Sequence, residues 1–265
     1  MTSDAALGAA HPSGERRRRS RVCEDDLGER LQRREVAHLE RLHRHLHHRS
    51  RRHLLCQTGE VLRFADGDGL EVVGATGLSV PADDDNLVRR ALRLVGRSAQ
   101  VTLTKRIPAG AGLGGGSADA AAVLRWAGLD DPEQAATLGA DVPFCVRGGR
   151  ARVTGIGEVL EPLPFIERTF TLVTPPFGCS TPAVYRAWDD LGGPRSTGPN
   201  DLEGAALVVA PELAAWRDDL ASATGVVPVL AGSGSTWFVE GAFPAAGRVV
   251  RTLPAAGLAT PQAPL

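Results

Sequence analysis

Residues 107–122 read I-P-A-G-A-G-L-G-G-G-S-A-D-A-A-A, and this stretch decides how the rest of the chain is interpreted. Five glycines lie between Gly110 and Gly116, directly before an alanine-rich run typical of a helix. Glycine adopts positive φ and lets the backbone approach a ligand closely. A helix start presents free N–H groups and the positive end of the helix dipole. The stretch therefore predicts a cradle for phosphate groups, with a merely tight connection as the alternative.

Two widespread phosphate-binding motifs are excluded at this loop. No Gly-Lys-Ser/Thr follows the glycines, so the loop is not a Walker A motif. No βαβ unit with a matching acidic residue follows, so a dinucleotide fingerprint is not supported either. Ser117 lies at the predicted helix start, where its hydroxyl can cap the helix or reach a phosphate or Mg²⁺.

The surrounding sequence predicts an α+β protein of two lobes, because strands and helices interleave without regular βαβ repetition. Residues 60–74 predict two short strands around a Gly/Asp turn. Further strands are expected at 100–108, 151–163 and 168–177, and on both sides of a tight Gly/Ser turn within 226–241. Helices are expected at 85–95, which opens with an Asp/Asn cap at Asp85 and Asn86, and at 117–127, 181–191 and 211–220. A basic amphipathic helix is expected at 27–48.

The first 57 residues differ in composition from the rest. All seven histidines lie between His11 and His53, and the only lysine of the chain is Lys105. Such a shift is typical of a tail or an added segment. We therefore predict three regions: an atypical Arg/His-rich segment at 1–57, an N-terminal lobe at 58–165 and a C-terminal lobe at 166–265.

Composition also limits the class of protein. The formal net charge is −1, which gives no case for nucleic acid or membrane as a partner. The four cysteines are far apart, with no CxxC pair, and predict free thiols. No apolar run reaches the length of a membrane span and no secretory signal is visible. A cytoplasmic location is expected.

Several motifs, in order along the chain, resemble those of the GHMP kinase superfamily. The glycine loop resembles its phosphate-binding motif, and G139-A-D-V-P-F resembles its catalytic segment. The remaining matches are D85-N-L-V, G155-I-G-E-V-L-E-P-L, T181-P-A-V-Y, N200-D-L-E and A231-G-S-G-S-T-W-F, the last resembling the superfamily's third motif. The resemblance covers residues 60 to 255 and implies the two-lobed GHMP kinase fold, with the first strands of the N-terminal lobe incomplete or aberrant.

The resemblance implies an ATP-dependent small-molecule kinase. The spelling G-L-G-G-G-S-A-D-A-A favours phosphorylation of the 2-hydroxyl of 4-(cytidine 5′-diphospho)-2-C-methyl-D-erythritol, a step of non-mevalonate isoprenoid biosynthesis. Homoserine-type and mevalonate-type kinases are the alternatives, as is a catalytically impaired relative that still binds ATP.

Site residues follow from the same resemblance. Asp141 would accept the substrate proton or orient the hydroxyl, with a turn before Pro143 as the alternative. Gly232, Ser233 and Gly234 would close the site from the second lobe, with a plain hairpin turn as the alternative. Residues that would hold the ATP phosphates are Pro108, Ala109, Gly110, Ala111, Gly112, Leu113, Gly114, Gly115, Gly116, Ser117 and Ala118, with Mg²⁺ beside Ser117.

Lys105 and Arg106, which flank the loop, are expected to be solvated charges at a strand end. A contribution to the electric field at the phosphates is the alternative.

The chain departs from the superfamily pattern at its N-terminus. Members open with a strand reading like A-K-(I/V/T)-(N/T)-L, whose lysine pairs with the catalytic aspartate; no lysine precedes Lys105 here. A one-nucleotide shift of the codons for residues 23–27 can spell Ala-Lys-Thr-Thr and an apolar residue. We therefore expect that residues 21–57 are translated out of frame.

Two other interpretations concern this basic segment. It could bind nucleic acid through its arginines, or a metal through His43, His45, His47 and His48. Charge runs are more often solvated tails, and the histidines form no defined ligand set.

Overall fold

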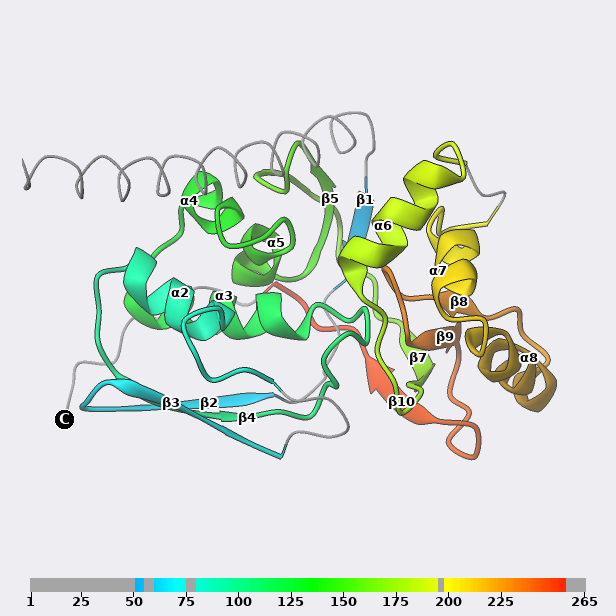
Figure 1. Cartoon of the computed structure of the whole chain (residues 1–265), viewed down its shortest axis with the longest axis horizontal. Coiled ribbons are helices and arrows are strands. Elements are labelled where there is room, and N and C mark those ends of the chain that lie inside the picture. Colours follow the sequence, from blue (N-terminus) through cyan, green and yellow to red (C-terminus); the bar gives the residue numbers. More distant parts are fainter. Residues whose placement is uncertain (1–50, 55–59, 75–79, 195–197, 256–265) are drawn as a thin grey trace, which may run out of the picture. The chain divides into compact units, whose positions relative to one another are not determined.

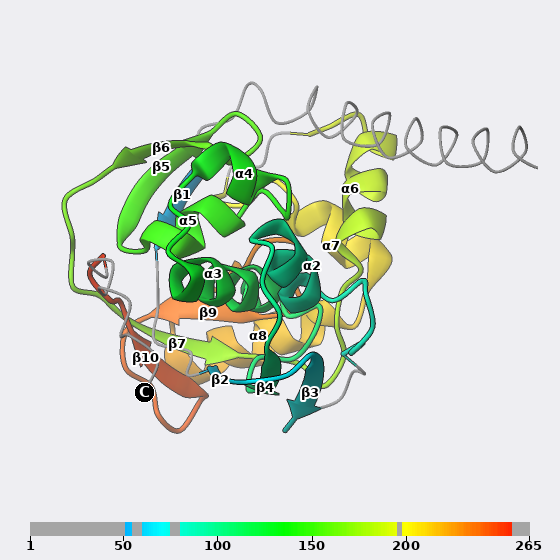
Figure 2. The same cartoon turned by 90° about the vertical axis from the view of Figure 1, so that its left-hand side faces the viewer.

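The helix that follows the glycines, α3 (Gly115–Ala127), lies at the centre of the N-terminal lobe. The computed structural model describes residues 51–54, 60–74, 80–194 and 198–255. The predicted helix at 27–48 and most of the Arg/His-rich segment lie outside these residues. The described residues belong to one compact unit. Helix α2 (Leu87–Leu94) packs beside α3, and both lie on one face of a three-stranded sheet (Figures 1 and 2).

That sheet has the order β2-β4-β3, formed by Val61–Ala65, Gln100–Thr104 and Gly69–Val73. The two strands predicted around the Gly/Asp turn are confirmed, but they do not lie next to each other in the sheet. Strand β4 runs between them, antiparallel to β2 and parallel to β3. Its alternating Val101 and Leu103 are fully buried, which accounts for its central place, whereas β2 and β3 are only partly buried.

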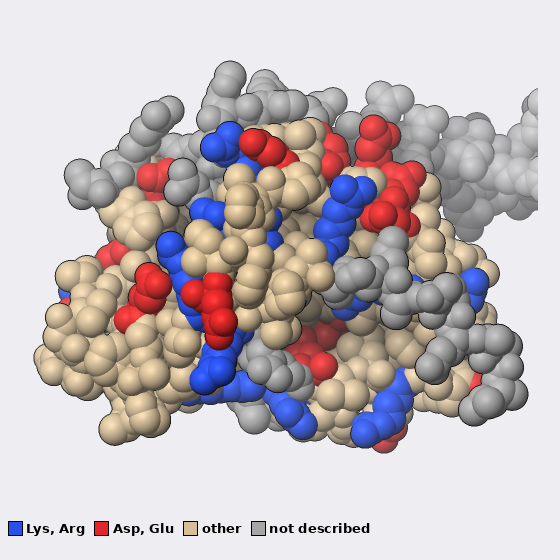
Figure 3. Space-filling view, turned by 180° about the vertical axis from the view of Figure 1, so that it is seen from behind, with Lys and Arg blue, Asp and Glu red and all other residues tan. Residues whose placement is uncertain are grey.

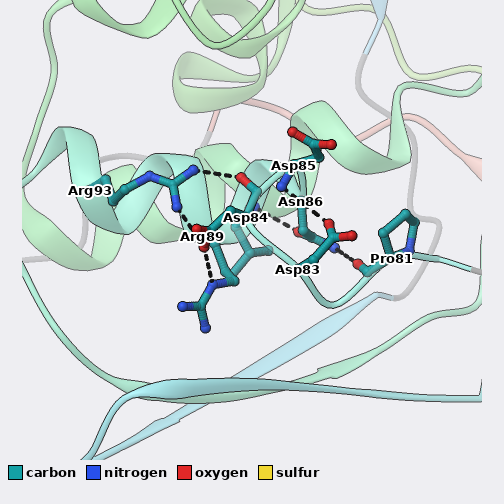
Figure 4. A network of polar contacts seen from close by, with 8 residues as sticks. Pro81, Asp83, Asp84, Asp85, Asn86, Arg89 and Arg93 are labelled. Atoms are coloured by element: carbon teal, nitrogen blue, oxygen red, sulfur yellow. Dashed lines mark hydrogen bonds and ion pairs between the residues drawn. The ribbon is translucent and has the colours of Figure 1, made fainter. Parts of the chain in front are cut away.

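The predicted cap of α2 is confirmed at Asn86, whose Oδ1 accepts a hydrogen bond of 2.8 Å from the Val88 N–H. Before it, the Asp84 carboxylate accepts from Arg89 Nε at 3.0 Å and pairs with Arg93 at 2.8 Å (Figure 4). The hydrogen bond from Arg89, followed by that from Arg93, lowers the pKa of Asp84. Asp84 and Arg93 are on the surface, so these ion pairs contribute little to stability.

A second sheet of this lobe has the order β1-β5-β6, formed by Arg51–Leu54, Arg150–Thr154 and Val159–Pro162. Helices α4 (Pro132–Ala136) and α5 (Val142–Arg147) come just before β5 in the chain. Strand β1, which lies within the segment expected to be out of frame, pairs antiparallel with β5.

One hydrophobic core joins these elements. Val88 and Leu92 of α2, Leu103 of β4 and Leu124 of α3 are buried in it. Phe64 of β2 stacks on Trp126 of α3, with ring centroids 4.6 Å apart.

The second lobe has a four-stranded sheet of order β10-β7-β9-β8. Its strands are Thr169–Val173 (β7), Val229–Leu230 (β8), Trp237–Glu240 (β9) and Arg248–Arg251 (β10). Strands β8 and β9 pair antiparallel around the predicted Gly/Ser turn. Helices α6 (Thr181–Asp190), α7 (Glu203–Val209) and α8 (Leu213–Thr224) share a separate core with β9, centred on Trp237, which is fully buried.

The two cores meet the expectation of an α+β protein, although the boundary at 165/166 stays a prediction.

Cys145 and Cys179 are free, buried thiols, and burial raises the pKa of Cys145 to about 12. Within the described ranges, no helix is long and apolar enough to cross a membrane. Figure 3 shows acidic and basic side chains interspersed on one face, where a nucleic-acid site would require basic ones to cluster.

Candidate active site

The glycine loop connects β4 to α3 through backbone conformations that other residues rarely adopt. Gly112 has φ +72° and Gly114 has φ +67°. Gly114 is also the N-cap residue of α3 and supplies no side-chain cap. The first N–H groups of the helix, at Gly115 and Gly116, therefore have no capping side chain in front of them, which is the arrangement a bound anion requires.

The loop is bonded directly to the Gly/Ser turn of the second lobe. The Gly110 carbonyl accepts hydrogen bonds from the N–H groups of Cys179 (2.9 Å) and Ser235 (3.0 Å). The Ala111 carbonyl accepts from the Thr236 N–H at 3.1 Å. The bonds from Ser235 and Thr236 join two segments more than 100 residues apart, so the two predicted glycine motifs form one structure.

Side chains of the second lobe hold the turn from behind. The Asn200 amide donates to the carbonyls of Leu230 (2.8 Å) and Gly232 (2.7 Å). Buried Ser233 shares a hydrogen bond of 2.9 Å with the Thr181 hydroxyl at the start of α6. Side chains from outside the hairpin therefore bond to Leu230, Gly232 and Ser233. A simple hairpin turn does not require such bonds.

Asp141 is the residue immediately before α5, and its side chain does not cap that helix. Its segment lies beside the first turn of α3, since a β-carbon on Gly139 would be 4.0 Å from the Ser117 hydroxyl. Gly157, in the turn between β5 and β6, packs onto the Ala140 carbonyl so closely that a β-carbon there would overlap it. The glycine loop is thus bonded to the Gly/Ser turn, and the first turn of the helix that follows the loop lies beside the Asp141 segment.

Lys105 does not behave as predicted. The expectation of a solvated strand-end charge holds for Arg106, which is exposed, but is wrong for Lys105, whose side chain is 5% exposed. Its ammonium lies 2.6 Å from Glu60 and 2.8 Å from Asp119, and both carboxylates are buried. The error arose because the sequence does not show that Glu60 and α3 enclose the end of β4.

Burial, followed by a hydrogen bond to Glu60, raises the pKa of Asp119 to about 7, although Lys105 acts in the opposite direction. Glu60 Oε2 and Asp119 Oδ1 are buried without a hydrogen-bond partner. Asp119 therefore binds a proton more readily than an exposed aspartate does.

Comparisons with known proteins agree with this geometry. Residues 86–149 match the family model of the GHMP kinases N terminal domain. The chain is 40% identical over 201 residues to the 4-diphosphocytidyl-2-C-methyl-D-erythritol kinase of Paracoccus denitrificans (strain Pd 1222), which covers 68% of this chain and 73% of that protein. The chain belongs to the 4-diphosphocytidyl-2-C-methyl-D-erythritol kinase family.

Other members of the 4-diphosphocytidyl-2-C-methyl-D-erythritol kinase family give the same result. The protein of that name from Ruegeria pomeroyi (strain ATCC 700808 / DSM 15171 / DSS-3) is 38% identical over 227 residues, 74% of this chain and 80% of its own. A crystal structure of 4-(cytidine 5′-diphospho)-2C-methyl-D-erythritol kinase superposes with a TM-score of 0.52 at 33% identity, covering 75% of this chain and 86% of that one. The chain is thus a GHMP-type small-molecule kinase, and its family uses ATP.

The structure brings together the predicted loop, the predicted turn and the segment of Asp141. Sequence reasoning missed three residues that support them: Glu60, Asp119 and Asn200. A signal existed for Asp119, an acidic residue inside an otherwise alanine-rich buried helix face. Nothing local marks Glu60. The N200-D-L-E motif indicated the family but not the bonds of the Asn200 amide to the turn, because the carbonyls that this amide binds lie 30 or more residues away.

Proposed function

We propose that the chain transfers the γ-phosphoryl group of ATP to the 2-hydroxyl of 4-(cytidine 5′-diphospho)-2-C-methyl-D-erythritol. The observation that carries the proposal is the close backbone contact between Gly112 and the turn at 231–234. This contact lies beside the start of α3, which has no side-chain cap. This produces a cradle of backbone groups where phosphates can be held without a lysine or arginine in the loop. The identity to the family over two thirds of the chain supports the choice of acceptor.

In the proposed reaction, a bond forms between the acceptor 2-oxygen and the γ-phosphorus while the bond to the β–γ bridging oxygen breaks, releasing ADP. The N–H groups at the start of α3 offset the negative charge of the phosphates. Asp141 orients the hydroxyl and receives its proton.

A magnesium ion fits the donor set at this place. Phosphate oxygens and a hydroxyl such as that of Ser117 are ligands that Mg²⁺ accepts. When bound, the ion would neutralise charge on the phosphates.

A catalytically impaired relative that still binds ATP is the second candidate, favoured by one observation. Lys105 is the only lysine of the chain, and Glu60 and Asp119 already bind its ammonium. It therefore does not replace the N-terminal lysine that superfamily members pair with the catalytic aspartate. This candidate predicts ATP binding without turnover.

We also propose that residues 21–57 are out of frame, which would explain the missing lysine. Resequencing the gene tests this directly. An uninterrupted frame without a lysine motif in any register would refute it.

An assay of ADP release with the cytidine-linked acceptor tests the function, run on the full chain and on a version with the N-terminal frame restored. Turnover that needs the acceptor supports the proposed substrate. If neither version turns over this acceptor while one turns over another small alcohol, the substrate assignment is wrong. If both versions turn over equally, the explanation of the N-terminus is wrong.

A further inference from the structure

Glu60, Lys105 and Asp119 form a buried ionic cluster beside the glycine loop. The Lys105 Nζ lies 2.6 Å from Glu60 Oε1 and 2.8 Å from Asp119 Oδ2. The three side chains are only 4–6% exposed. Removing such charges from water costs several kcal/mol per ion, so the cluster is an expensive way to stabilise a fold.

The cluster contacts the chain on both sides of the loop. Lys105 directly follows β4, and Glu60 Oε1 also accepts a hydrogen bond of 3.3 Å from the Ile107 N–H at the loop entrance. Asp119 lies on α3, past the loop exit. A β-carbon on Gly115 would be 3.1 Å from the Lys105 Nζ, so the ammonium packs against the first residue of the helix.

The loop itself has little means of holding its shape. Residues 110–116 include five glycines, which lose much conformational entropy on ordering and offer no side chains to pack. The second lobe holds the loop at Gly110 and Ala111. The ionic cluster is the counterpart on the other side, at Ile107 and Gly115.

We propose that Glu60, Lys105 and Asp119 are positioning residues for the glycine loop, whose ion pairs hold the end of β4 against α3 and fix the loop in the conformation that binds ATP phosphates. The proposal rests on the proposed function in one respect, that the loop binds those phosphates. The three residues act through the backbone at Ile107 and Gly115. In enzymes, a displacement of about 1 Å can lower the reaction rate about a hundredfold. Small shifts of the loop therefore matter.

The test compares ATP with adenosine as ligands of the full-length chain in Mg²⁺ buffer. In Lys105→Met, the Kd for ATP should rise at least about tenfold, while the Kd for adenosine should change less than about threefold, because only the phosphates depend on the loop. The matched control is Arg152→Met, which removes the exposed pair between Arg152 and Glu161. It should leave both constants unchanged.

A second pair of variants covers the case in which Lys105→Met does not fold. Asp119→Leu keeps a side chain that branches at Cγ but removes the acceptor, whereas Asp119→Asn keeps an acceptor for Lys105. The proposal expects Asp119→Leu to weaken ATP binding selectively and Asp119→Asn to bind ATP within about threefold of the unsubstituted chain.

Each remaining outcome decides the matter. Equal weakening of ATP and adenosine, or unchanged ATP binding in a folded Lys105→Met chain, overturns the proposal. Failure of both Lys105→Met and Asp119→Leu to fold assigns the cluster to folding alone and also overturns it. An unsubstituted chain that binds ATP but does not phosphorylate the acceptor refutes the proposed substrate and leaves the positioning role intact; one that binds no ATP refutes both.

Discussion

Gly112 and Ala231 lie so close together that a β-carbon on Gly112 would be 2.1 Å from the Ala231 carbonyl oxygen. The same β-carbon would lie 2.9 Å from the Gly234 nitrogen. Real β-carbons do not approach other atoms so closely, so the position tolerates glycine alone. The contact makes the shape of the glycine loop depend on the second lobe.

Gly112→Ala should therefore destabilise the chain strongly and remove ATP binding. The positive φ costs about 1–2 kcal/mol for alanine, and overlap with backbone adds about 1–3 kcal/mol because backbone cannot move aside as a side chain can. Thermal unfolding and ATP titration measure the two effects. The control is Gly128→Ala, where φ is +78° but nothing lies within 4 Å of the new methyl group. Equal losses in the two variants would contradict the packing argument.

Asp141→Asn should lower kcat by about 10²–10⁴-fold, because the amide cannot accept the proton of the acceptor hydroxyl. The Kd for ATP should stay the same, since the phosphates are assigned to the loop. Steady-state kinetics and ATP titration separate the two. Asp218→Asn, at an exposed position paired with Arg217, is the control and should leave kcat unchanged. A kcat within threefold of the unsubstituted chain would exclude Asp141 as the base.

Asn200→Asp should loosen the Gly/Ser turn. Both hydrogen bonds from the Asn200 amide would be lost, and a carboxylate would face the carbonyls of Leu230 and Gly232. The expected cost is about 1–3 kcal/mol of unfolding free energy, measured by urea denaturation. Asn86→Asp is the control, because aspartate can still accept from the Val88 N–H, and the single hydrogen bond that the Asn86 amide donates, to the Pro81 carbonyl, is exposed. Similar stability of both variants would show that Asn200 does not hold the turn.

Asp119→Asn should change how stability depends on pH. The pKa of Asp119 rises from 3.8 to about 7 on folding, so the folded chain binds more protons than the unfolded chain between those values. Its contribution to stability is therefore full in acid and is lost as pH rises through about 7. Stability of the variant relative to the unsubstituted chain should increase between pH 5 and pH 8, by on the order of 2 kcal/mol.

Charged and titratable groups that face Asp119 come from three other elements: Glu60 before β2, Lys105 after β4 and Cys145 on α5. Urea denaturation at the two pH values measures the effect. Asp131→Asn is the control. A hydrogen bond from Gln134 lowers the pKa of Asp131, so its contribution is lost only in acid, below this range. Parallel pH profiles for Asp119→Asn and the unsubstituted chain would contradict the assignment.

Gly115→Ala and Gly116→Ala should differ although the residues are neighbours in the first turn of α3. A methyl group on Gly115 meets the Lys105 Nζ at 3.1 Å and the Ile107 Cβ at 3.3 Å, and we expect a loss of about 1–3 kcal/mol. On Gly116 it meets only the Leu87 Cδ1, at 3.3 Å. There the better helix propensity of alanine, about 1 kcal/mol, should offset the contact. The melting temperatures of the two variants measure this difference. Equal shifts in Gly115→Ala and Gly116→Ala would contradict close packing between Gly115 and Lys105.

Local signals in the sequence determined a good part of the fold and the candidate site. The cap at Asn86, the helix after Gly114 and the hairpin of β8 and β9 were predicted, because caps, glycine conformations and strand alternation act over a few residues. The glycine loop indicated an anion site for the same reason. The resemblance of ordered motifs then indicated the family, which the comparisons confirm.

Only the tertiary structure decided which of these parts touch. It placed β4 between β2 and β3, since pairing depends on which strand the core buries most rather than on nearness in sequence. The sequence predicted a surface position for Lys105, but the structure places it at the centre of an ionic cluster. Its partners Glu60 and Asp119 lie 45 and 14 residues away in the chain. It also set Gly112 against Ala231. Contacts between distant residues follow from how the cores pack, and a sequence does not display that packing locally.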